Sequence, residues 1–380
     1  MLDLAVLFGG RSIEHEISVI TGLQAILALN PKKYKILPVY FALNGKWYTG
    51  DPLLERSFYR KLPAAYSDLT EITLLPDPSI GGFKDLALNR TYPVDRCLLC
   101  FHGQYGEDGC VQGLLELAGL PYTGSRVLSS ALTMSKSHTK LLLQALNIPC
   151  LPHVVVDKQE AVSDLAAVRK KILDTLRYPL FIKPNHLGSS IGIAKATDKN
   201  SLDRALAKVF LYDSAAIIEP YLDNLLEINV SVLEGDPPRS SAVEIPIASQ
   251  EALSYEDKYL KGGAKSTGGS SQGMAGLTRM IDPQDLDLKI KQGVINHALK
   301  AFKELSCSGV CRFDFMLDTS TETLYFNEAN PIPGSLSFYL WDRTEPKLLY
   351  SELLDVLIER CAHKSALQRS LKKDFGFQAL

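Results

Sequence analysis

Two segments in which apolar and polar residues alternate constrain the fold of this chain more than any other feature. They are residues 310–317 and 323–330. Each has the length and the period of two that predict a β-strand, and the polar residues 318–322 between them predict the turn of a hairpin. The register of such a hairpin decides which side chains share a face. Pairing Leu317 with Thr323 puts the polar positions of both strands on one face, whereas a slip of one residue separates them.

One arginine and three oxygen donors occupy these polar positions. Arg312 and Asp314 are two apart, as are Glu328 and Asn330, so each pair shares a face. Oxygen ligands without histidine or cysteine suit a hard cation, and Mg²⁺ held by one or two carboxylates usually serves to bind phosphate. A half-buried strand with a solvated polar face also explains the alternation. It does not explain why the second strand runs directly into residues 331–334, a proline- and glycine-containing turn.

The composition is that of a soluble globular protein of two or three domains, with 380 residues, 46% hydrophobic and 22% charged. A formal net charge of -2 without a basic block argues against a nucleic-acid partner, and no apolar run is long enough to span a bilayer. The amino-terminal residues lack the pattern of a signal peptide, and the seven scattered cysteines fit a reducing cytosol. We therefore expect a cytoplasmic protein that binds small molecules.

Strands and helices alternate through the first part of the chain. We expect strands at residues 4–8, 35–41 and 97–101, and helices at residues 18–29 and 111–118. This β-α-β order predicts an α/β unit with a parallel sheet and covering helices, in which ligands gather beyond the carboxyl ends of the strands.

The rest of the chain divides into two further α/β units. We expect an amino-terminal domain, a central domain, a carboxy-terminal domain and a tail, at residues 1–125, 126–225, 226–365 and 366–380. The one low-complexity patch, residues 261–273, is rich in glycine and serine, so it cannot pack a core and predicts a mobile loop.

A loop of small residues at 187–192 follows a predicted strand and matches neither standard nucleotide fingerprint. The absence of G-x-G-x-x-G and of G-x-x-x-x-G-K-[ST] argues against a Rossmann dehydrogenase and a P-loop enzyme. Backbone N–H groups and the hydroxyls of Ser189 and Ser190 can still close over phosphates, although a structural turn explains the loop equally well. Lys183 favours phosphate binding because a buried lysine requires an anion.

Seven segments lie in one order over nearly the whole chain. They are Leu7-Phe-Gly-Gly-Arg-Ser-Ile-Glu-His-Glu-Ile-Ser18, His102-Gly-Gln-Tyr-Gly-Glu-Asp-Gly-Cys-Val-Gln-Gly113, Pro121-Tyr-Thr-Gly124, Lys183-Pro-Asn-His-Leu-Gly-Ser-Ser-Ile-Gly192, Asp257-Lys-Tyr259, Arg312-Phe-Asp314 and Glu328-Ala-Asn330. In content and order these segments resemble the D-alanine:D-alanine ligases of the ATP-grasp superfamily.

The resemblance implies three α/β domains with ATP held between the central and carboxy-terminal ones. It also implies a reaction in which the carboxylate of one D-alanine attacks the γ-phosphate of ATP. A second D-alanine then captures the acyl phosphate, giving D-alanyl-D-alanine for peptidoglycan synthesis. By the same resemblance, Asp314, Glu328 and Asn330 are the ligands of two Mg²⁺ ions, for which Mn²⁺ can substitute, and the enzyme is a homodimer.

The resemblance assigns further roles residue by residue. Arg312 and the backbone N–H of Gly334 would stabilise the tetrahedral oxyanion. Glu14 would bind the ammonium of the first D-alanine, with Ser189 and Tyr259 as its partners across the cleft. Without the resemblance, a first-turn acid favoured by the helix dipole is a serious rival interpretation of Glu14, and an aromatic strand residue is the favoured interpretation of Tyr259.

The nucleotide and acceptor sites follow in the same way. The implied phosphate ligands are Lys136, Lys183, Lys258 and Ser190, the adenine hinge is Glu219 with Tyr221 and Leu222, and the ribose ligand is Glu227. His102, Tyr339 and Leu340 fall near the second substrate, and the last two stand at the positions where many relatives place a serine and a leucine.

This last departure leaves the second substrate open. A related ligase that uses D-serine, D-lactate or another amino acid as acceptor is the first alternative, and a nucleotide-binding regulator without turnover is the second. We also expect the 261–273 loop to become ordered only when nucleotide binds.

Overall fold

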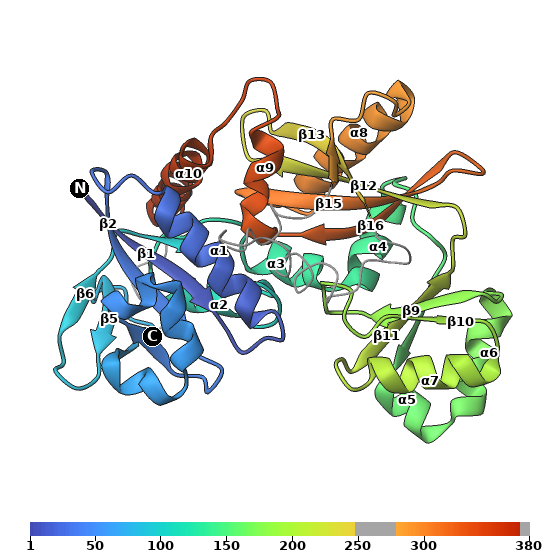
Figure 1. Ribbon diagram of the computed structural model, residues 1–380, viewed down its shortest axis with the longest axis horizontal. Coiled ribbons are helices and arrows are strands. Elements are labelled where there is room, and N and C mark those ends of the chain that lie inside the picture. Colours follow the sequence, from blue (N-terminus) through green and yellow to red (C-terminus); the bar gives the residue numbers. More distant parts are fainter. Residues whose placement is uncertain (248–278, 373–380) are drawn as a thin grey trace.

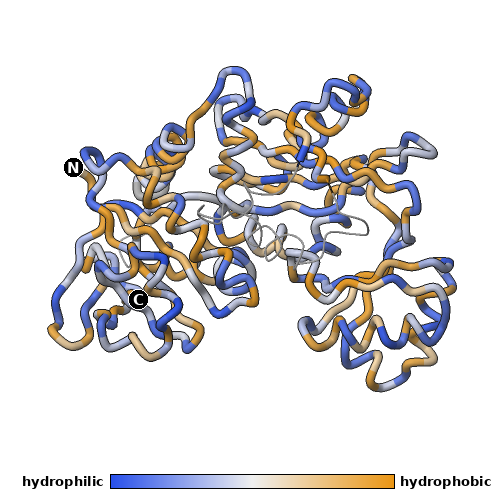
Figure 2. Tube along the Cα trace, viewed as in Figure 1, coloured by the Kyte–Doolittle hydropathy of each residue, from blue (hydrophilic) through white to orange (hydrophobic). Residues whose placement is uncertain are grey.

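Three β-sheets, each with its own helices, form the chain in a computed structural model that describes residues 1–247 and 279–372 (Figure 1). Hydrophobic residues concentrate along the strands and the inner faces of the helices, and hydrophilic residues at the outer loops (Figure 2). In the described residues no helix is both long and apolar enough to cross a membrane.

The first sheet is mixed, with the order β6-β5-β4-β3-β2-β1-β7. Its parallel part is β1 (Leu2–Gly9), β2 (Tyr34–Phe41) and β7 (Arg96–Leu99), as the β-α-β pattern predicts. The prediction of a wholly parallel sheet is wrong, because four short strands extend it in antiparallel fashion, namely β3 (Trp47–Thr49), β4 (Thr70–Thr73), β5 (Gly82–Asp85) and β6 (Thr91–Pro93). Strands this short carry too few residues to show a period. Helices α1 (His15–Ala28) and α2 (Cys110–Leu117) accompany this sheet, with 3₁₀ turns at Asp51–Leu54, Arg56–Lys61 and Ala64–Asp68.

The central sheet is antiparallel, with the order β10-β9-β11-β8. Its strands are β8 (Val154–Asp157), β9 (Leu180–Pro184), β10 (Ala194–Ala196) and β11 (Ala215–Pro220), and its helices are α5 (Lys158–Ser163), α6 (Leu165–Thr175) and α7 (Lys199–Val209). β9 and β10 are the two arms of a hairpin, so the small-residue loop at 187–192 lies at its tip. Helices α3 (Val127–Met134) and α4 (Lys136–Ala145) precede this sheet, and α4 packs beside the third sheet.

The third sheet is antiparallel, with the order β14-β13-β12-β15-β16. Its strands are β12 (Leu225–Leu233), β13 (Arg239–Pro246), β14 (Arg279–Ile281), β15 (Val310–Asp318) and β16 (Thr323–Asn330). Helix α8 (Leu288–Glu304) covers one face, where Phe313, Phe315 and Val230 are buried with Val294 and Phe302. The alternate side chains of the same strands therefore face away from this core.

The carboxy-terminal segment returns to the first sheet. After a 3₁₀ turn (Gly334–Ser337) and α9 (Phe338–Trp341), helix α10 (Tyr350–Ser370) lies beside α1 (Figure 1). Leu353, Leu354, Leu357 and Ile358 are buried in the core of the first sheet. Most of α10 falls within the expected carboxy-terminal domain at residues 226–365, yet this helix packs on the first sheet.

Candidate active site

A cavity of about 450 Å³ lies between the central and third sheets and collects most of the residues predicted from the sequence. The predicted residues that line it are Lys136, Lys183, Ser190, Glu219, Tyr221, Leu222, Glu227, Arg312, Asp314 and Glu328. They come from five strands, from the loop at 187–192, from the segment after β11 and from the start of α4. Residues distant in the sequence therefore meet in one hollow, which matches the usual form of a small-molecule site.

The predicted hairpin places its polar side chains on the cavity face, but in a different register. The pairing of Leu317 with Thr323 is wrong, since Leu317 lies opposite Leu324. A bulge between Asp314 and Phe315 changes the register again, so that Asp314 lies opposite Glu328 and Arg312 opposite Asn330. The slip at the turn alone would put the polar side chains of the two strands on opposite faces. The bulge shifts the pairing by one more residue, so all four side chains lie on one face.

Asn327 is the extra residue of the bulge, and the sequence analysis missed it. It also lines the cavity, and its Oδ1 accepts a hydrogen bond of 2.9 Å from Lys183 Nζ. Strict alternation would turn this side chain toward the core. An unpaired strand residue is not visible in a hydrophobic pattern, so no signal in this single sequence marks it.

Each carboxylate of the predicted metal set has a cation of the chain beside it. Arg312 donates Nε–H and Nη2–H to the two oxygens of Asp314 at 2.6 and 2.7 Å. Burial lowers the pKa of Arg312, but the Asp314 charge outweighs burial and raises it well above its ordinary value. Lys136 Nζ lies 3.2 Å from Glu328 Oε2, and Asn330 Nδ2 donates to Asp314 Oδ2 at 3.1 Å.

These oxygens fit a hard cation. The side chains of Asp314 and Glu328 lie directly opposite each other on adjacent strands, with the Asn330 amide beside them. No group of three or more His, Cys, Asp or Glu side chains suited to a metal occurs in residues 1–247 and 279–372, so an amide has to complete the set. Carboxylate and amide oxygens without nitrogen or sulfur ligands are suited to Mg²⁺.

A buried cluster of two lysines and one carboxylate lies at the wall of the cavity. Glu219 Oε1 is 2.6 Å from Lys140 Nζ, and Glu219 Oε2 is 2.6 Å from Lys183 Nζ. Burial raises the pKa of Glu219, but the two lysines outweigh it and lower the pKa to about 2. The cluster thus keeps one excess positive charge. Because the carboxylate is held by lysines, any contact of Glu219 with adenine would come from its backbone.

Aromatic and aliphatic side chains line the other end of the cavity. Phe181 and Tyr221 lie with ring centroids 6.2 Å apart, and Lys195 Nζ is 3.5 Å from the centre of the Tyr221 ring. Leu151 and Met316 also line this end, and the sequence analysis assigned them no role. A flat apolar slot beside cations is suited to a nucleobase.

Glu14 and Ser189 meet across the gap between the first and central sheets. The buried Glu14 lies just before α1, and its Oε1 accepts a hydrogen bond from Ser189 Oγ. Ser189 and Ser190 both have a left-handed backbone, with φ of 55° and 58°, which turns the loop toward the first domain. Gly103 packs against this pair, since a Cβ there would lie 2.9 Å from Glu14 Oε2.

His102 and Gly334 lie where the first sheet meets the segment after β16. His102 is buried, and its Nε2 is 2.8 Å from Thr21 Oγ1. Burial and then the Arg312 charge lower the pKa of His102 to about 3, so it is neutral at pH 7. Gly334 begins a turn whose next three residues have φ between 51° and 53°, and Ser335 N–H donates to Thr21 Oγ1 at 3.3 Å.

Glu107 is a second residue that the sequence analysis missed. Its Oε2 accepts from Gly103 N–H at 2.6 Å and its Oε1 from Ile332 N–H at 3.3 Å. It thereby links the loop of His102 to the segment that follows Asn330. Burial and then the Glu14 charge raise the pKa of Glu107 well above its ordinary value. Its place within a glycine-rich motif was the available signal.

Tyr339 and Leu340 lie on α9, near the β13 and β14 end of the third sheet. Leu340 is fully buried and packs with Tyr339, whose Oη donates to Glu244 Oε1 at 3.4 Å. Burial, followed by the Glu244 charge, raises the pKa of Tyr339. The predicted residues Tyr259 and Lys258 and the 261–273 loop lie outside the described residues.

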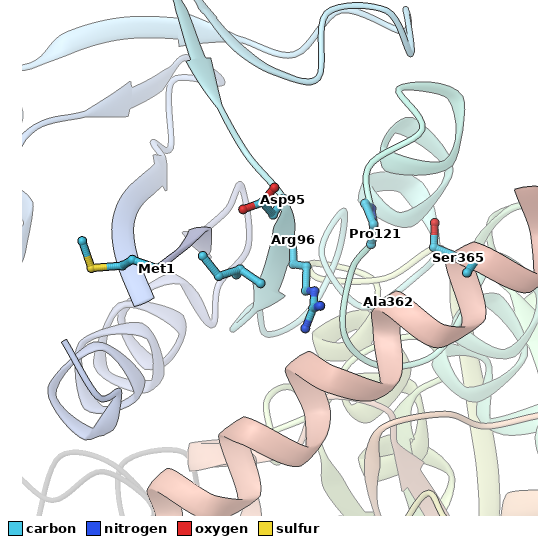
Figure 3. A pocket seen from close by; sticks show the side chains of 8 residues that line it. Met1, Asp95, Arg96, Pro121, Ala362 and Ser365 are labelled. Carbon is cyan, nitrogen blue, oxygen red and sulfur yellow. The ribbon is translucent and has the colours of Figure 1, made fainter. Parts of the chain in front are cut away.

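Another hollow lies between the start of β1, β7 and α10 (Figure 3). Arg96 points toward α10 and donates from Nη1 to the Ile358 carbonyl at 3.0 Å. The contact fixes the last helix on the first sheet. None of the predicted site residues lines this hollow.

Two family models match the chain. The model described as D-ala D-ala ligase N-terminus matches residues 3–125, and the one described as D-ala D-ala ligase C-terminus matches residues 142–359. A D-alanine--D-alanine ligase of Thermosipho melanesiensis is 33% identical over 358 residues, which cover 94% of this chain and 93% of the relative.

Solved structures show the same likeness. The D-alanine-D-alanine ligase from Coxiella burnetii superposes with a TM-score of 0.79 at 29% identity, over 97% of this chain and 96% of that one. The VanG D-Ala:D-Ser ligase from Enterococcus faecalis superposes with a TM-score of 0.78 at 29% identity, over 95% of this chain and 99% of that one. The expected α/β fold of the ATP-grasp class is confirmed.

Proposed function

The chain belongs to the D-alanine–D-alanine ligase family, and from this premise we propose that it joins two D-alanines to D-alanyl-D-alanine while ATP is converted to ADP and phosphate. The product would serve peptidoglycan synthesis. The observation that carries the proposal is the single cavity in which Arg312, Asp314 and Glu328 face Lys136 and Lys183. Such an arrangement suits a phosphoryl group between a divalent metal and lysines.

We assign metal binding to Asp314, Glu328 and Asn330. When bound there, Mg²⁺ would neutralise the charge on the transferring phosphoryl oxygens. The number of ions, two by the resemblance, is part of the proposal, as is the use of Mn²⁺. Three carboxylate and amide side chains from two adjacent strands support it, because their mutual positions are fixed by the sheet ladder.

ATP would lie along the cavity. The slot of Phe181, Tyr221 and Leu222 suits the adenine, and Glu227 at its rim suits the ribose hydroxyls. The excess positive charge beside Lys183, with Lys136, Ser190 and, from outside the described residues, Lys258, suits the phosphates. Backbone N–H groups of the left-handed loop at 187–192 would add neutral donors to the same anion.

The first D-alanine would lie between the first domain and this loop. Glu14 is assigned to its ammonium, with Ser189 and Tyr259 completing the contacts. This leaves the carboxylate of the amino acid directed at the γ-phosphate, and holding the two reactants in line lowers the entropic part of the barrier. The acyl phosphate forms as the carboxylate oxygen bonds to phosphorus and ADP leaves.

The second D-alanine would attack the acyl phosphate from the side of His102 and Tyr339. The lone pair of its neutral amine bonds to the carbonyl carbon, and the carbonyl oxygen becomes negative. The carbonyl then re-forms as the bond to phosphate breaks, and the proton that the amine loses leaves with the phosphate. Arg312 and the Gly334 N–H are assigned to this oxygen, where removal of one donor typically costs about 3 kcal/mol. His102 is neutral at pH 7, so it would orient the acceptor by hydrogen bonding rather than by charge.

The proposal also covers the domain boundaries, the cellular location and the oligomeric state of the protein. The divisions at residues 125 and 225 find support in the family-model match that ends at residue 125 and in the separate sheets on either side of residue 225. A cytoplasmic location fits the seven free cysteines. A homodimer rests on the family resemblance alone.

The test is ADP release from Mg²⁺-ATP with D-alanine alone, followed by product mass, with Asp314→Asn as the inactive control. Formation of D-alanyl-D-alanine by the native chain alone supports the proposal. Turnover that requires D-serine or D-lactate in addition would move the enzyme to the alternative acceptor. Absence of any substrate-dependent ADP release would instead favour a silent nucleotide-binding protein.

A further inference from the structure

A buried ion pair occupies the end of the cavity opposite the phosphate-facing lysines. Arg279 Nη1 on β14 lies 2.6 Å from Glu244 Oε2 on β13, and only 7% and 1% of the two side chains are exposed. Both residues line the cavity together with Arg312 and Asp314. Neither belongs to the residues that the family resemblance assigns, so their presence in the site needs its own explanation.

The carboxylate of Glu244 is fully occupied by contacts within the protein. Besides Arg279, its Oε1 accepts from Asn229 Nδ2 at 3.2 Å and from Tyr339 Oη at 3.4 Å. A buried carboxylate with three donors is a support for its neighbours rather than a ligand for a substrate. Its negative charge makes it possible to bury the Arg279 cation at the cavity wall.

Arg279 is held in a fixed plane. Its guanidinium carbon lies 3.9 Å from the centre of the Tyr339 ring, and Glu244 holds one of its nitrogens. A guanidinium carries five N–H donors in a rigid fork, so it can keep Glu244 and receive a second carboxylate at the same time. Stacking and pairing leave it little freedom, which is the preparation that bidentate recognition requires.

The third sheet sets the distance between this arginine and the metal site. Glu244, Asn229, Asp314 and Glu328 lie opposite one another on four adjacent strands and form one polar row. Neighbouring strands are about 4.8 Å apart, so Glu244 is roughly 10 Å from Asp314. An acceptor amino acid in this interval would have its carboxylate on the Arg279 side and its amine on the side of Arg312 and Asp314.

We propose that Arg279 binds the carboxylate of the acceptor amino acid, with Tyr339 and Glu244 as the residues that position its guanidinium. The proposal rests on the proposed ligase function and assigns one of its binding contacts. It explains how this site can recognise an acceptor carboxylate although Tyr339 stands where many relatives place a serine. Phosphate is the less suitable ligand because the lysines lie at the other end of the row.

The experiment is a competition between two acceptors, D-alanine and D-alaninamide, which lacks the carboxylate. Both are supplied together with Mg²⁺-ATP, and the ratio of dipeptide to dipeptide amide is measured by mass. This ratio reports the relative kcat/KM for the two acceptors and does not depend on how active a preparation is. The native chain should favour D-alanine, and Arg279→Met should reduce that preference on the order of 10- to 100-fold.

Two further variants serve as controls for the competition experiment. Arg239→Met removes an arginine from the neighbouring strand β13, stacked 5.3 Å from the Trp341 ring, and should leave the ratio unchanged. If Arg279→Met does not fold because Glu244 loses its partner, the double variant Glu244→Gln with Arg279→Gln removes both charges together and should show the same loss of preference.

The outcomes separate the two proposals. If an Arg279 variant still ligates and gives the same product ratio as the native chain, the assignment of Arg279 is overturned, while the proposed ligase function stands. Loss of ATP-dependent ligation with both acceptors in the native chain would overturn the ligase function and this assignment with it. A preference that falls in the Arg279 variants and survives in Arg239→Met supports the assignment.

Discussion

Replacement of Lys140 by methionine tests whether the buried cluster of Lys140, Lys183 and Glu219 at the cavity wall is held together by charge. Lys140 is fully buried on α4, with its Nζ 2.6 Å from Glu219 and 3.2 Å from the Phe326 carbonyl that it donates to. Methionine keeps the length and the apolar stem of the side chain and removes only the ammonium. Glu219 would then keep Lys183 as its one cationic partner in the cluster.

The expected loss follows from two opposing terms. Two unit charges 2.6 Å apart attract with about 6 kcal/mol at an effective dielectric constant of roughly 20. Burial of the ammonium opposes this by several kcal/mol and is the main cause that lowers the pKa of Lys140. Because the carboxylate stays buried after the substitution, we expect a net loss of about 3–5 kcal/mol in the free energy of unfolding.

Urea denaturation followed by circular dichroism measures this loss, with Lys170→Met as the matched control. Lys170 pairs with Asp174 on α6, and the two side chains are 80% and 63% exposed. Such a surface pair contributes at most about 0.5 kcal/mol, so its variant should unfold at nearly the native urea concentration. Equal midpoints for the two variants would refute the reasoning, since burial and attraction would then cancel at Lys140.

Three further predictions follow from the site. Asp314→Asn should lower Mg²⁺-dependent ADP release on the order of 100-fold if its carboxylate holds the metal, and it should also lower the stability in urea, because the buried Arg312 loses its charged partner. Gly103→Ala should raise the KM for D-alanine, because the added Cβ would collide with Ser12 and lie 2.9 Å from Glu14 Oε2. The pKa of Glu219 is depressed to about 2, so its contribution is present above its ordinary value of 4.5 and is lost as the pH falls toward 2. Lowering the pH of the native chain across this range should therefore reduce the free energy of unfolding on the order of 3 kcal/mol. The Glu219→Gln variant should show a weaker dependence of this free energy on pH.

The alternation of the β15 and β16 residues was enough to predict which side chains face the site, but not how the strands pair. The pattern gives the parity of each strand, and that part is confirmed by Arg312 and Asp314 facing Asn330 and Glu328. The register depends on the turn and on the extra residue Asn327, which are properties of the backbone. The hydrophobic period alone therefore cannot show whether the two strands pair with a uniform one-residue shift or with a shift that a bulge corrects.

Buried charge marks a second boundary of sequence reasoning. A lysine is solvated by default, so Lys140 and Arg279 gave no signal, although the chain buries each beside a carboxylate. Their partners Glu219 and Glu244 lie on other strands, far away in sequence. Only the sheet arrangement brings such pairs together, and this is why the cluster and the far end of the polar row appear in the structure alone.

The pairing of Asp314 and Glu328 with cations of the chain bears on how the site accepts its substrates. In the described part of the chain Asp314 is bound by Arg312, and Glu328 by Lys136. On the proposed assignment, a divalent metal replaces both cations at these carboxylates. The same two cations are the groups assigned to the oxyanion and to the phosphates. Metal binding would thus release positive charge toward the substrate anions, so the metal and the nucleotide should bind together more tightly than the sum of their separate affinities.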